Sequence, residues 1–191
     1  GHEIGHHGYE HEFVGNKGRE TERDVLLKGI ESLKRITGET PKGYRSPAGN
    51  TGPHTFDLLL DHNFIYDSSL VGDDSPYWVR TPQSNRSLLE IPYSWEMDDA
   101  PHFLFSFSPY FTGMSSQNKV YEIWEAEFAG AYEDGGFLSL VMHPQIIGRR
   151  SRMAMLERLI EQMLKQEGVW FGTHLEIALA WKQLSKAPKS D

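Results

Sequence analysis

The chain has 191 residues, 38% of them hydrophobic and 12% aromatic, as is typical of a folded globular protein with a substantial core. Its net charge of −8 argues against a nucleic-acid or anionic-membrane partner, because such partners are bound through basic patches. The absence of cysteine excludes disulfides and thiolate metal ligands, and no apolar run approaches the length of a membrane span.

The first twelve residues contain four of the nine histidines: His2, His6, His7 and His11. Imidazole is the commonest protein ligand of metals, and a helical turn or tight loop can direct His7 and His11 at one ion. Gly8 allows the backbone to bend between them. The competing interpretation is that these are core histidines satisfied by hydrogen bonds. A metal site also needs a third ligand, which these twelve residues do not clearly supply.

The rest of the chain alternates predicted helices and strands. The first helix has apolar residues at helical spacing, Thr21 as its cap and Gly38 after its end. Thr173 and Glu176 form a capping-box pattern that starts the last helix. In chain order we predict a helix at 21–37, a strand at 43–45, a helix with Pro53 in its first turn, a strand at 63–68, a polar loop at 71–87, a strand at 88–92, a loop at 93–101, a helix at 118–132, a strand at 137–142, a helix at 153–166, a strand at 169–171 and a helix from about Thr173 to Leu184.

This alternation predicts an α/β fold with a parallel sheet, either open and doubly wound or closed into a barrel. In both architectures, ligands bind at the carboxyl ends of the strands. Four residues with suitable chemistry follow predicted strands, namely Arg45, Asp98, Asp99 and His143. The sequence therefore predicts a site formed by these residues.

Each of these four residues has a structural and a functional interpretation. His143 is either a buried structural histidine or a general acid or base. Arg45 either forms a surface ion pair, worth about 0–1 kcal/mol, or orients a catalytic carboxylate through two hydrogen bonds. We expect one of Asp98 and Asp99 to cap a turn, while the other holds a histidine in its working tautomer.

An aromatic residue and an arginine run are further candidates. Trp95 either packs in the core or at a rim, or serves as a platform for a sugar ring. Residues 149–152 read Arg-Arg-Ser-Arg at the start of a predicted helix, where each cation opposes the helix dipole by about 0.3–1 kcal/mol. The run is therefore either a solvated face or an anion-binding rim of a substrate site.

Taken together, the motifs resemble those of the polysaccharide deacetylase family (NodB homology, carbohydrate esterase family 4). Residues 1–11 resemble the family's second motif, in which Gly-His-Glu-Ile-Gly leads into a His-x-x-x-His metal pair. Residues 45–50, 95–99 and 140–144 resemble the third, fourth and fifth motifs. The details resemble the signal-less branch with the Helicobacter-type peptidoglycan deacetylase, cyclic imide hydrolases and, more distantly, allantoinases.

The resemblance implies a distorted (β/α) barrel formed by residues 1–191 as one domain. It implies metal ligation by His7 and His11, general acid catalysis by His143, and positioning of the catalytic groups by Arg45 and Asp98. The residues that we expect to bind the substrate are Asn50, Trp95, Asp99 and Arg149.

One departure from the family is the lack of its first motif, a strand ending in Asp-Asp that precedes the histidine pair. In relatives, one aspartate completes the metal site and the other is the catalytic base. We therefore expect that the domain is truncated at its N-terminus and the barrel incomplete because the first strand or strands are missing. As it stands, we expect the chain to bind metal weakly and to be inactive.

The resemblance implies a metal-dependent hydrolase of amide C–N bonds that deacetylates N-acetylglucosamine-type polysaccharide or peptidoglycan. One alternative is a cyclic imide or ureide hydrolase; another is a non-catalytic carbohydrate-binding or interaction module. Zinc is the expected metal, with cobalt, iron or nickel as alternatives. We expect a small-molecule or glycan substrate, no nucleic acid, no membrane, a homo-oligomer as relatives suggest, and a cytoplasmic location, since no signal segment is visible.

Overall fold

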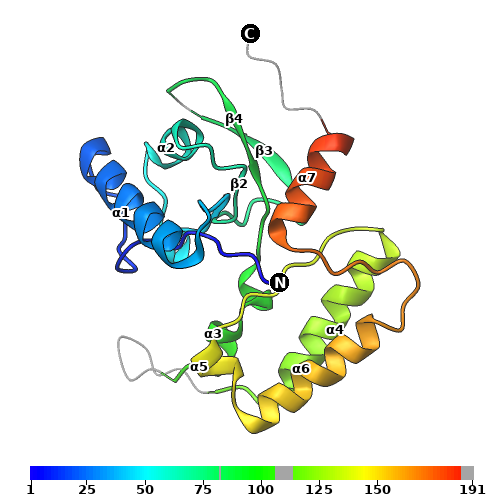
Figure 1. Cartoon of the computed structure of the whole chain (residues 1–191). Coiled ribbons are helices and arrows are strands. Elements are labelled where there is room, and N and C mark those ends of the chain that lie inside the picture. The colour runs from blue at the N-terminus through cyan, green and yellow to red at the C-terminus, as the bar shows by residue number, and fades with distance from the viewer. Residues whose placement is uncertain (82, 106–113, 186–191) are drawn as a thin grey trace. The chain divides into compact units, whose positions relative to one another are not determined.

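The computed structural model describes residues 1–81, 83–105 and 114–185 (Figure 1). It divides into two compact units. Unit 1 comprises Gly1–Pro92 with Gly172–Asp191, and unit 2 comprises Tyr93–Phe171. The prediction of a single domain stays a prediction. None of the described helices combines the length and the apolar character that crossing a membrane requires.

Unit 1 contains a four-stranded sheet with the order β1-β2-β4-β3. The strands β1 (Gly43–Tyr44), β2 (Tyr66–Asp67) and β4 (Ser87–Glu90) are parallel, and β3 (Tyr77–Arg80) adds an antiparallel edge. The predicted α/β class with a largely parallel sheet is confirmed. Because parallel neighbours end at the same edge, the residues that follow β1, β2 and β4 come together there.

The helices of unit 1 are α1 (Arg19–Thr37), α2 (Thr55–Asp61) and α7 (His174–Leu184), with a short 3₁₀ turn, η1 (Pro47–Gly49), after β1. Burial of apolar surface, worth about 25 cal/mol per Å², stabilises their packing on the sheet. The buried core cluster consists of Leu26, Tyr44, Leu58, Leu59, Phe64 and Leu88.

The ends of these helices test the predicted caps. Gly38 ends α1 in the left-handed conformation (φ 82°), and the capping box of Thr173 and Glu176 is present at the start of α7; both predictions are confirmed. Thr21 is not the cap of α1, because the helix extends to Arg19 and is preceded by a glycine without a side-chain cap. Pro53 lies before α2 rather than in its first turn.

His6 is a structural histidine of unit 1. Its side chain is 1% exposed, and its backbone pairs with Tyr44 in parallel, which extends the sheet by one bridge. Its Nε2 donates to the carbonyl of Leu26 (3.1 Å), while its Nδ1 accepts from the N–H of Gly8 (3.2 Å). Burial lowers the pKa of this imidazole, so it stays neutral. The core-histidine interpretation therefore holds for His6.

Replacing Gly29 with alanine is expected to destabilise the protein by about 1–3 kcal/mol, the usual cost of overpacking a core. A Cβ at Gly29 would lie 2.0 Å from Nε2 of His6, so α1 can approach this ring only because residue 29 has no side chain. Urea denaturation measures the effect. Gly130→Ala in α4 (Gln117–Glu133) is the matched control, because its Cβ would meet nothing within 4 Å. This variant should gain about 0.5–1 kcal/mol of helix stability. Equal stability of the two variants would contradict the prediction.

Unit 2 is organised around two helices, α4 (Gln117–Glu133) and α6 (Arg150–Met163), which lie side by side (Figure 1). The short elements η2 (Trp95–Met97), α3 (Asp99–Phe103) and α5 (Pro144–Ile147) complete it. Its core contains Met97, Phe103, Val120, Tyr121, Trp124, Ile146, Ile147, Met155, Leu156, Leu159 and Met163.

Several predicted elements of the chain were wrong. The polar loop 71–87 contains β3, an edge strand whose residues are only partly buried and therefore lack a clear apolar alternation. The loop 93–101 contains η2 and most of α3. Residues 137–142 form no strand beyond one parallel bridge between Asp98 and Val141, and residues 169–171 are not a strand, with Trp170 and Phe171 more than half exposed. In both segments an apolar run was mistaken for a strand.

Candidate active site

His7 and His11 lie beside each other in a loop of unit 1. Their ring centroids are 5.1 Å apart and their planes are inclined by 71°. Gly8 and His11 have positive φ angles of 78° and 58°, which turn the backbone so that both rings face the same region. This is a tight loop rather than the helical turn that the spacing also allowed.

The tautomer of His7 follows from its backbone partner. Its Nδ1 lies 2.8 Å from the carbonyl oxygen of Arg45. A carbonyl oxygen only accepts, so Nδ1 carries the hydrogen and Nε2 is the basic nitrogen. Metal-binding histidines commonly have one ring nitrogen engaged with a carbonyl or carboxylate and bind the ion with the other. The His7–His11 geometry therefore fits two ligands of a divalent metal.

Glu12 closes the histidine loop. Its carboxylate accepts hydrogen bonds from the backbone N–H groups of Tyr9 (3.1 Å) and Glu10 (2.6 Å). Burial acts to raise the pKa of Glu12, but these backbone hydrogen bonds outweigh it and hold the pKa below its usual value. Glu12 therefore stabilises the conformation of the loop between His7 and His11. Within the described part of the chain, no set of three converging metal-binding side chains includes His7 or His11, so their third ligand stays a prediction.

His143 in unit 2 is held by Asp99. The side chain of Asp99 is completely buried; its Oδ1 lies 2.6 Å from Nδ1 of His143 and its Oδ2 accepts from the backbone N–H of His143 (3.0 Å). The single bridge between Asp98 and Val141 causes this arrangement, because Asp99 donates its N–H to Val141 (3.0 Å) two residues before His143. A carboxylate at Nδ1 places the hydrogen there and makes Nε2 the reactive nitrogen.

Asp98 has a different position from Asp99. Its side chain accepts from the N–H of Ala100 (2.7 Å) and caps α3, and its carboxylate is 3.8 Å from Nδ1 of His143. The expected division holds, in which one aspartate caps a turn and the other holds a histidine. Asp98, Asp99 and His143 are also the one trio among the described residues that could in principle hold a metal. Without an ion, Asp99 and His143 are joined directly by the 2.6 Å hydrogen bond as a carboxylate–imidazole pair.

Arg45 follows β1 at the carboxyl edge of the sheet. Its Nε donates to the carbonyl of Ser68 (2.7 Å) and its Nη2 to the hydroxyl of the same residue (2.5 Å). Ser68 follows β2, the parallel neighbour of β1, so the strand order explains this contact. The proposed role of Arg45 in orienting a catalytic carboxylate stays a prediction.

The sequence analysis missed two acids beside Arg45. Asp67 and Glu90 end β2 and β4, are register partners and are both 0% exposed. Burial raises the pKa of both groups, and the charge of Asp67 adds to the effect on Glu90, whose pKa is raised to about 10. Their signal was an acidic residue inside an apolar predicted strand, a place where carboxylates are rare.

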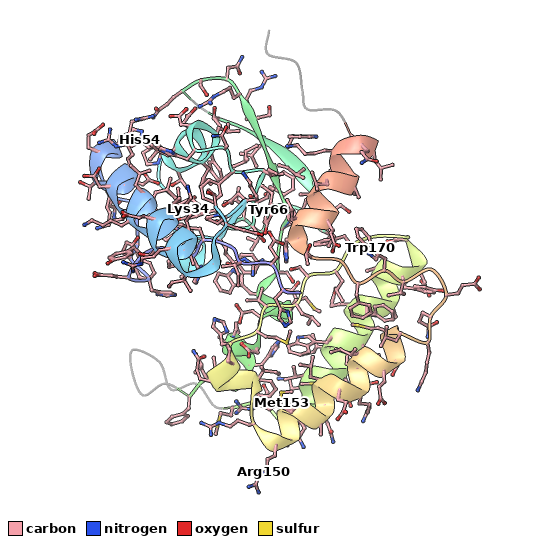
Figure 2. The ribbon with its side chains drawn as sticks, in the orientation of Figure 1. Lys34, His54, Tyr66, Arg150, Met153 and Trp170 are labelled. Atoms are coloured by element: carbon pink, nitrogen blue, oxygen red, sulfur yellow. The ribbon has the colours of Figure 1, made fainter. Side chains whose placement is uncertain are left out.

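The residues predicted to bind the substrate have mixed surroundings. Asn50 accepts from the N–H of Gly15 (2.7 Å) and so links two loops of unit 1. Trp95 is 48% exposed in unit 2. Arg149 precedes α6, and the next residue, Arg150, extends away from the helix (Figure 2). Arg152 instead donates to a backbone carbonyl (2.7 Å) and lies over the ring of Phe103, so it packs within unit 2. The predicted substrate-binding roles of Asn50, Trp95, Asp99 and Arg149 stay predictions, as does the positioning of catalytic groups by Asp98.

An α/β scaffold whose buried carboxylate holds an imidazole defines a class, that of proteins equipped for acid–base chemistry. The polysaccharide deacetylase family matches residues 1–66. The peptidoglycan deacetylase of Helicobacter pylori is 36% identical over 203 residues, covering 93% of this chain and 69% of that protein. The chain belongs to the polysaccharide deacetylase family.

Two solved structures are similar to this fold. The structure of a Mycobacterium smegmatis protein assigned as a polysaccharide deacetylase has a TM-score of 0.90 and 35% identity, covering 100% of this chain and 66% of that one. Puue allantoinase has a TM-score of 0.82 and 32% identity, covering 96% of this chain and 60% of that one. The deacetylase-type α/β fold is thereby confirmed. The chain spans about two thirds of the length of the Helicobacter and Mycobacterium relatives.

Proposed function

We propose that the protein hydrolyses amide C–N bonds and that its reaction is the N-deacetylation of N-acetylglucosamine units in polysaccharide or peptidoglycan. The observation that carries the proposal is the hydrogen bond between the buried carboxylate of Asp99 and Nδ1 of His143. The identity to the Helicobacter pylori peptidoglycan deacetylase supports the substrate class.

His143 acts as the general acid in this reaction. With its Nδ1–H held by Asp99, the ring presents Nε2 for a second proton, and the negative charge of Asp99 stabilises the imidazolium that results. Nε2 then gives this proton to the departing amine nitrogen. An amine is a poor leaving group without a proton, so this step contributes about 10²–10⁴-fold to the rate.

His7 and His11 would hold a divalent metal, with zinc as the expected ion. When bound, such an ion supplies a Lewis acid for the amide carbonyl and lowers the pKa of a bound water. The Nδ1–H of His7 on the Arg45 carbonyl keeps Nε2 in its basic form for ligation. The guanidinium of Arg45 is held by Ser68 and provides a fixed positive charge. This charge would orient the catalytic carboxylate that the family's first motif supplies.

A second candidate is hydrolysis of a cyclic imide or ureide. It is favoured by the similarity to Puue allantoinase, at 32% identity over 96% of this chain. The reaction also breaks an amide C–N bond, so the same acid and metal ligands serve it. The two candidates differ in the substrate alone.

A substrate panel separates the candidates. In a chain that also carries the family's Asp-Asp motif, we expect the zinc-loaded protein to release acetate from N-acetylglucosamine oligomers or peptidoglycan, and not to open succinimide, hydantoin or allantoin. Acetate release is measured by an enzyme-coupled assay and ring opening by the loss of ultraviolet absorbance. The protein treated with a chelator is the control. Ring opening without acetate release would overturn deacetylation in favour of the second candidate.

A further inference from the structure

Asp67 and Glu90 have no part in the reaction proposed above, although both are fully buried. They are register partners in the parallel pairing of β2 and β4, so their side chains leave the sheet on the same face. Burying two carboxyl groups together is costly unless hydrogen bonds compensate. The partners of Asp67 lead away from the sheet edge toward the histidine loop.

The first link is Ser69. Oδ1 of Asp67 accepts from the hydroxyl of Ser69 (2.8 Å), and Oδ2 accepts from the backbone N–H of the same residue (2.9 Å). The hydroxyl oxygen of Ser69 in turn accepts from the backbone N–H of Ser46 (2.8 Å). The carboxylate of Asp67 therefore holds the amide hydrogen of Ser46 through one hydroxyl group.

The second link is a single peptide group. The N–H of Ser46 and the carbonyl of Arg45 belong to the same planar unit, which resonance makes rigid. That carbonyl accepts from Nδ1 of His7 (2.8 Å). Every donor in the series points toward Asp67: the ring N–H of His7 to the peptide, the peptide N–H to Ser69, and the hydroxyl of Ser69 to the carboxylate. Hydrogen bonds aligned in this way polarise one another.

We propose that Asp67 is a positioning residue for His7, whose ring it orients and whose Nδ1–H tautomer it fixes through Ser69 and the Arg45–Ser46 peptide group. Carboxylates commonly contact the outer nitrogen of a metal-binding histidine directly, and here one acts through two intermediates. The inference rests on the proposed function in taking His7 as a metal ligand.

Asp67 rather than Glu90 is the charged member of the pair. Asp67 accepts two hydrogen bonds from Ser69, whereas Glu90 accepts one from the N–H of Leu70 (2.8 Å). Oε2 of Glu90 is buried without a hydrogen-bond partner among the described residues, which costs a neutral carboxyl group less than it costs a carboxylate. Burial, and then the charge of Asp67, raises the pKa of Glu90 to about 10.

Three variants test the inference: Asp67→Asn, which removes the charge, Ser69→Ala, which removes the relay hydroxyl, and the control Glu90→Gln, which replaces a neutral acid with a neutral amide. Zinc affinity is measured by competition with a chromogenic chelator. Loss of an outer-shell partner weakens metal binding by about 10–100-fold, and we expect about 10-fold for Asp67→Asn and Ser69→Ala. We expect unchanged zinc affinity for Glu90→Gln.

A second measurement does not involve a metal. The ¹⁵N shifts of the His7 ring in the metal-free protein report its tautomer. We expect hydrogen at Nδ1 in the native protein and a mixture of tautomers in Asp67→Asn and Ser69→Ala. If the native protein binds no zinc, the proposed metal site is wrong. The His7 tautomer in the variants still decides whether Asp67 acts on His7 through Ser69 and the Arg45–Ser46 peptide group.

Two results would overturn the inference. One is that Asp67→Asn and Ser69→Ala keep both the native zinc affinity and the His7 tautomer. The other is that Glu90→Gln loses as much zinc affinity as Asp67→Asn, which would show that the two buried carboxyl groups have a purely structural role. Circular dichroism checks the fold of each variant. If Asp67→Asn does not fold, Ser69→Ala decides, because it keeps both carboxyl groups.

The pH dependence of stability checks the protonation of Glu90. The groups that face it are Asp67 on β2, Tyr77 on β3 and the charge of Arg45. The unfolded chain releases this proton near the ordinary pKa of 4.5 and the folded protein near 10, so the free energy of unfolding falls as pH rises between these values. We expect Glu90→Gln to lessen this fall between about pH 7.5 and 9.5, the part of that window above the titration of most histidines. An equally steep fall would show that Glu90 is ionised in the native protein.

Discussion

Replacing His143 with alanine, in a chain that also carries the family's Asp-Asp motif, is expected to reduce amide hydrolysis by about 10²–10⁴-fold, the usual contribution of general acid catalysis. The physical reason is that the departing nitrogen would leave without a proton. His143 is not one of the proposed metal ligands, so the zinc content of the variant should equal that of the native protein. Steady-state kinetics and metal analysis measure the two quantities.

Substitutions at the neighbouring positions 98 and 99 test whether His143 depends on its hydrogen bond to Asp99. Asp99→Asn keeps the shape of the side chain but removes the charge that holds Nδ1–H of His143, so we expect a loss approaching that of the alanine variant. Asp98→Asn keeps the cap of α3, because asparagine caps a helix about as well as aspartate, and should leave most of the activity. If Asp98→Asn is the more damaging change, or if His143→Ala retains native turnover, His143 is not the acid that Asp99 supports.

Replacing His7 or His11 with alanine is expected to weaken zinc binding by at least about 10²-fold. Four-ligand zinc sites in small proteins bind with about 10–16 kcal/mol, so a single ligand accounts for several kcal/mol. The 5.1 Å separation of the ring centroids is the structural reason to expect that both rings contribute. Competition with a chromogenic chelator measures the affinity, and elemental analysis measures the bound metal.

His2→Ala is the matched control, because His2 is an exposed residue of the same segment. It should leave zinc binding unchanged. His6→Ala should instead lower the stability of the fold, since that ring is buried and bonded at both nitrogens. Native zinc affinity in both His7→Ala and His11→Ala, or an equal loss in His2→Ala, would show that the pair is not the metal site.

Local sequence signals predicted some elements well. The apolar spacing and Gly38 predicted α1 and its end, and Thr173 with Glu176 predicted the start of α7, because a helix cap depends on residues within a few positions. The apolar runs 137–142 and 169–171 were misread as strands. A strand exists only where a distant partner offers its backbone groups, and a short apolar run does not contain that information.

The sequence by itself determined the family, through motifs whose residue types and spacing are visible in the chain. Only the tertiary structure decided which of two adjacent aspartates holds His143, which of the neighbouring histidines is structural, and that Asp67 and Glu90 are buried together. The physical reason is that hydrogen-bond geometry and burial depend on what other segments bring alongside. Asp98 and Asp99 are chemically the same, and one bridge to Val141 gives them different neighbours.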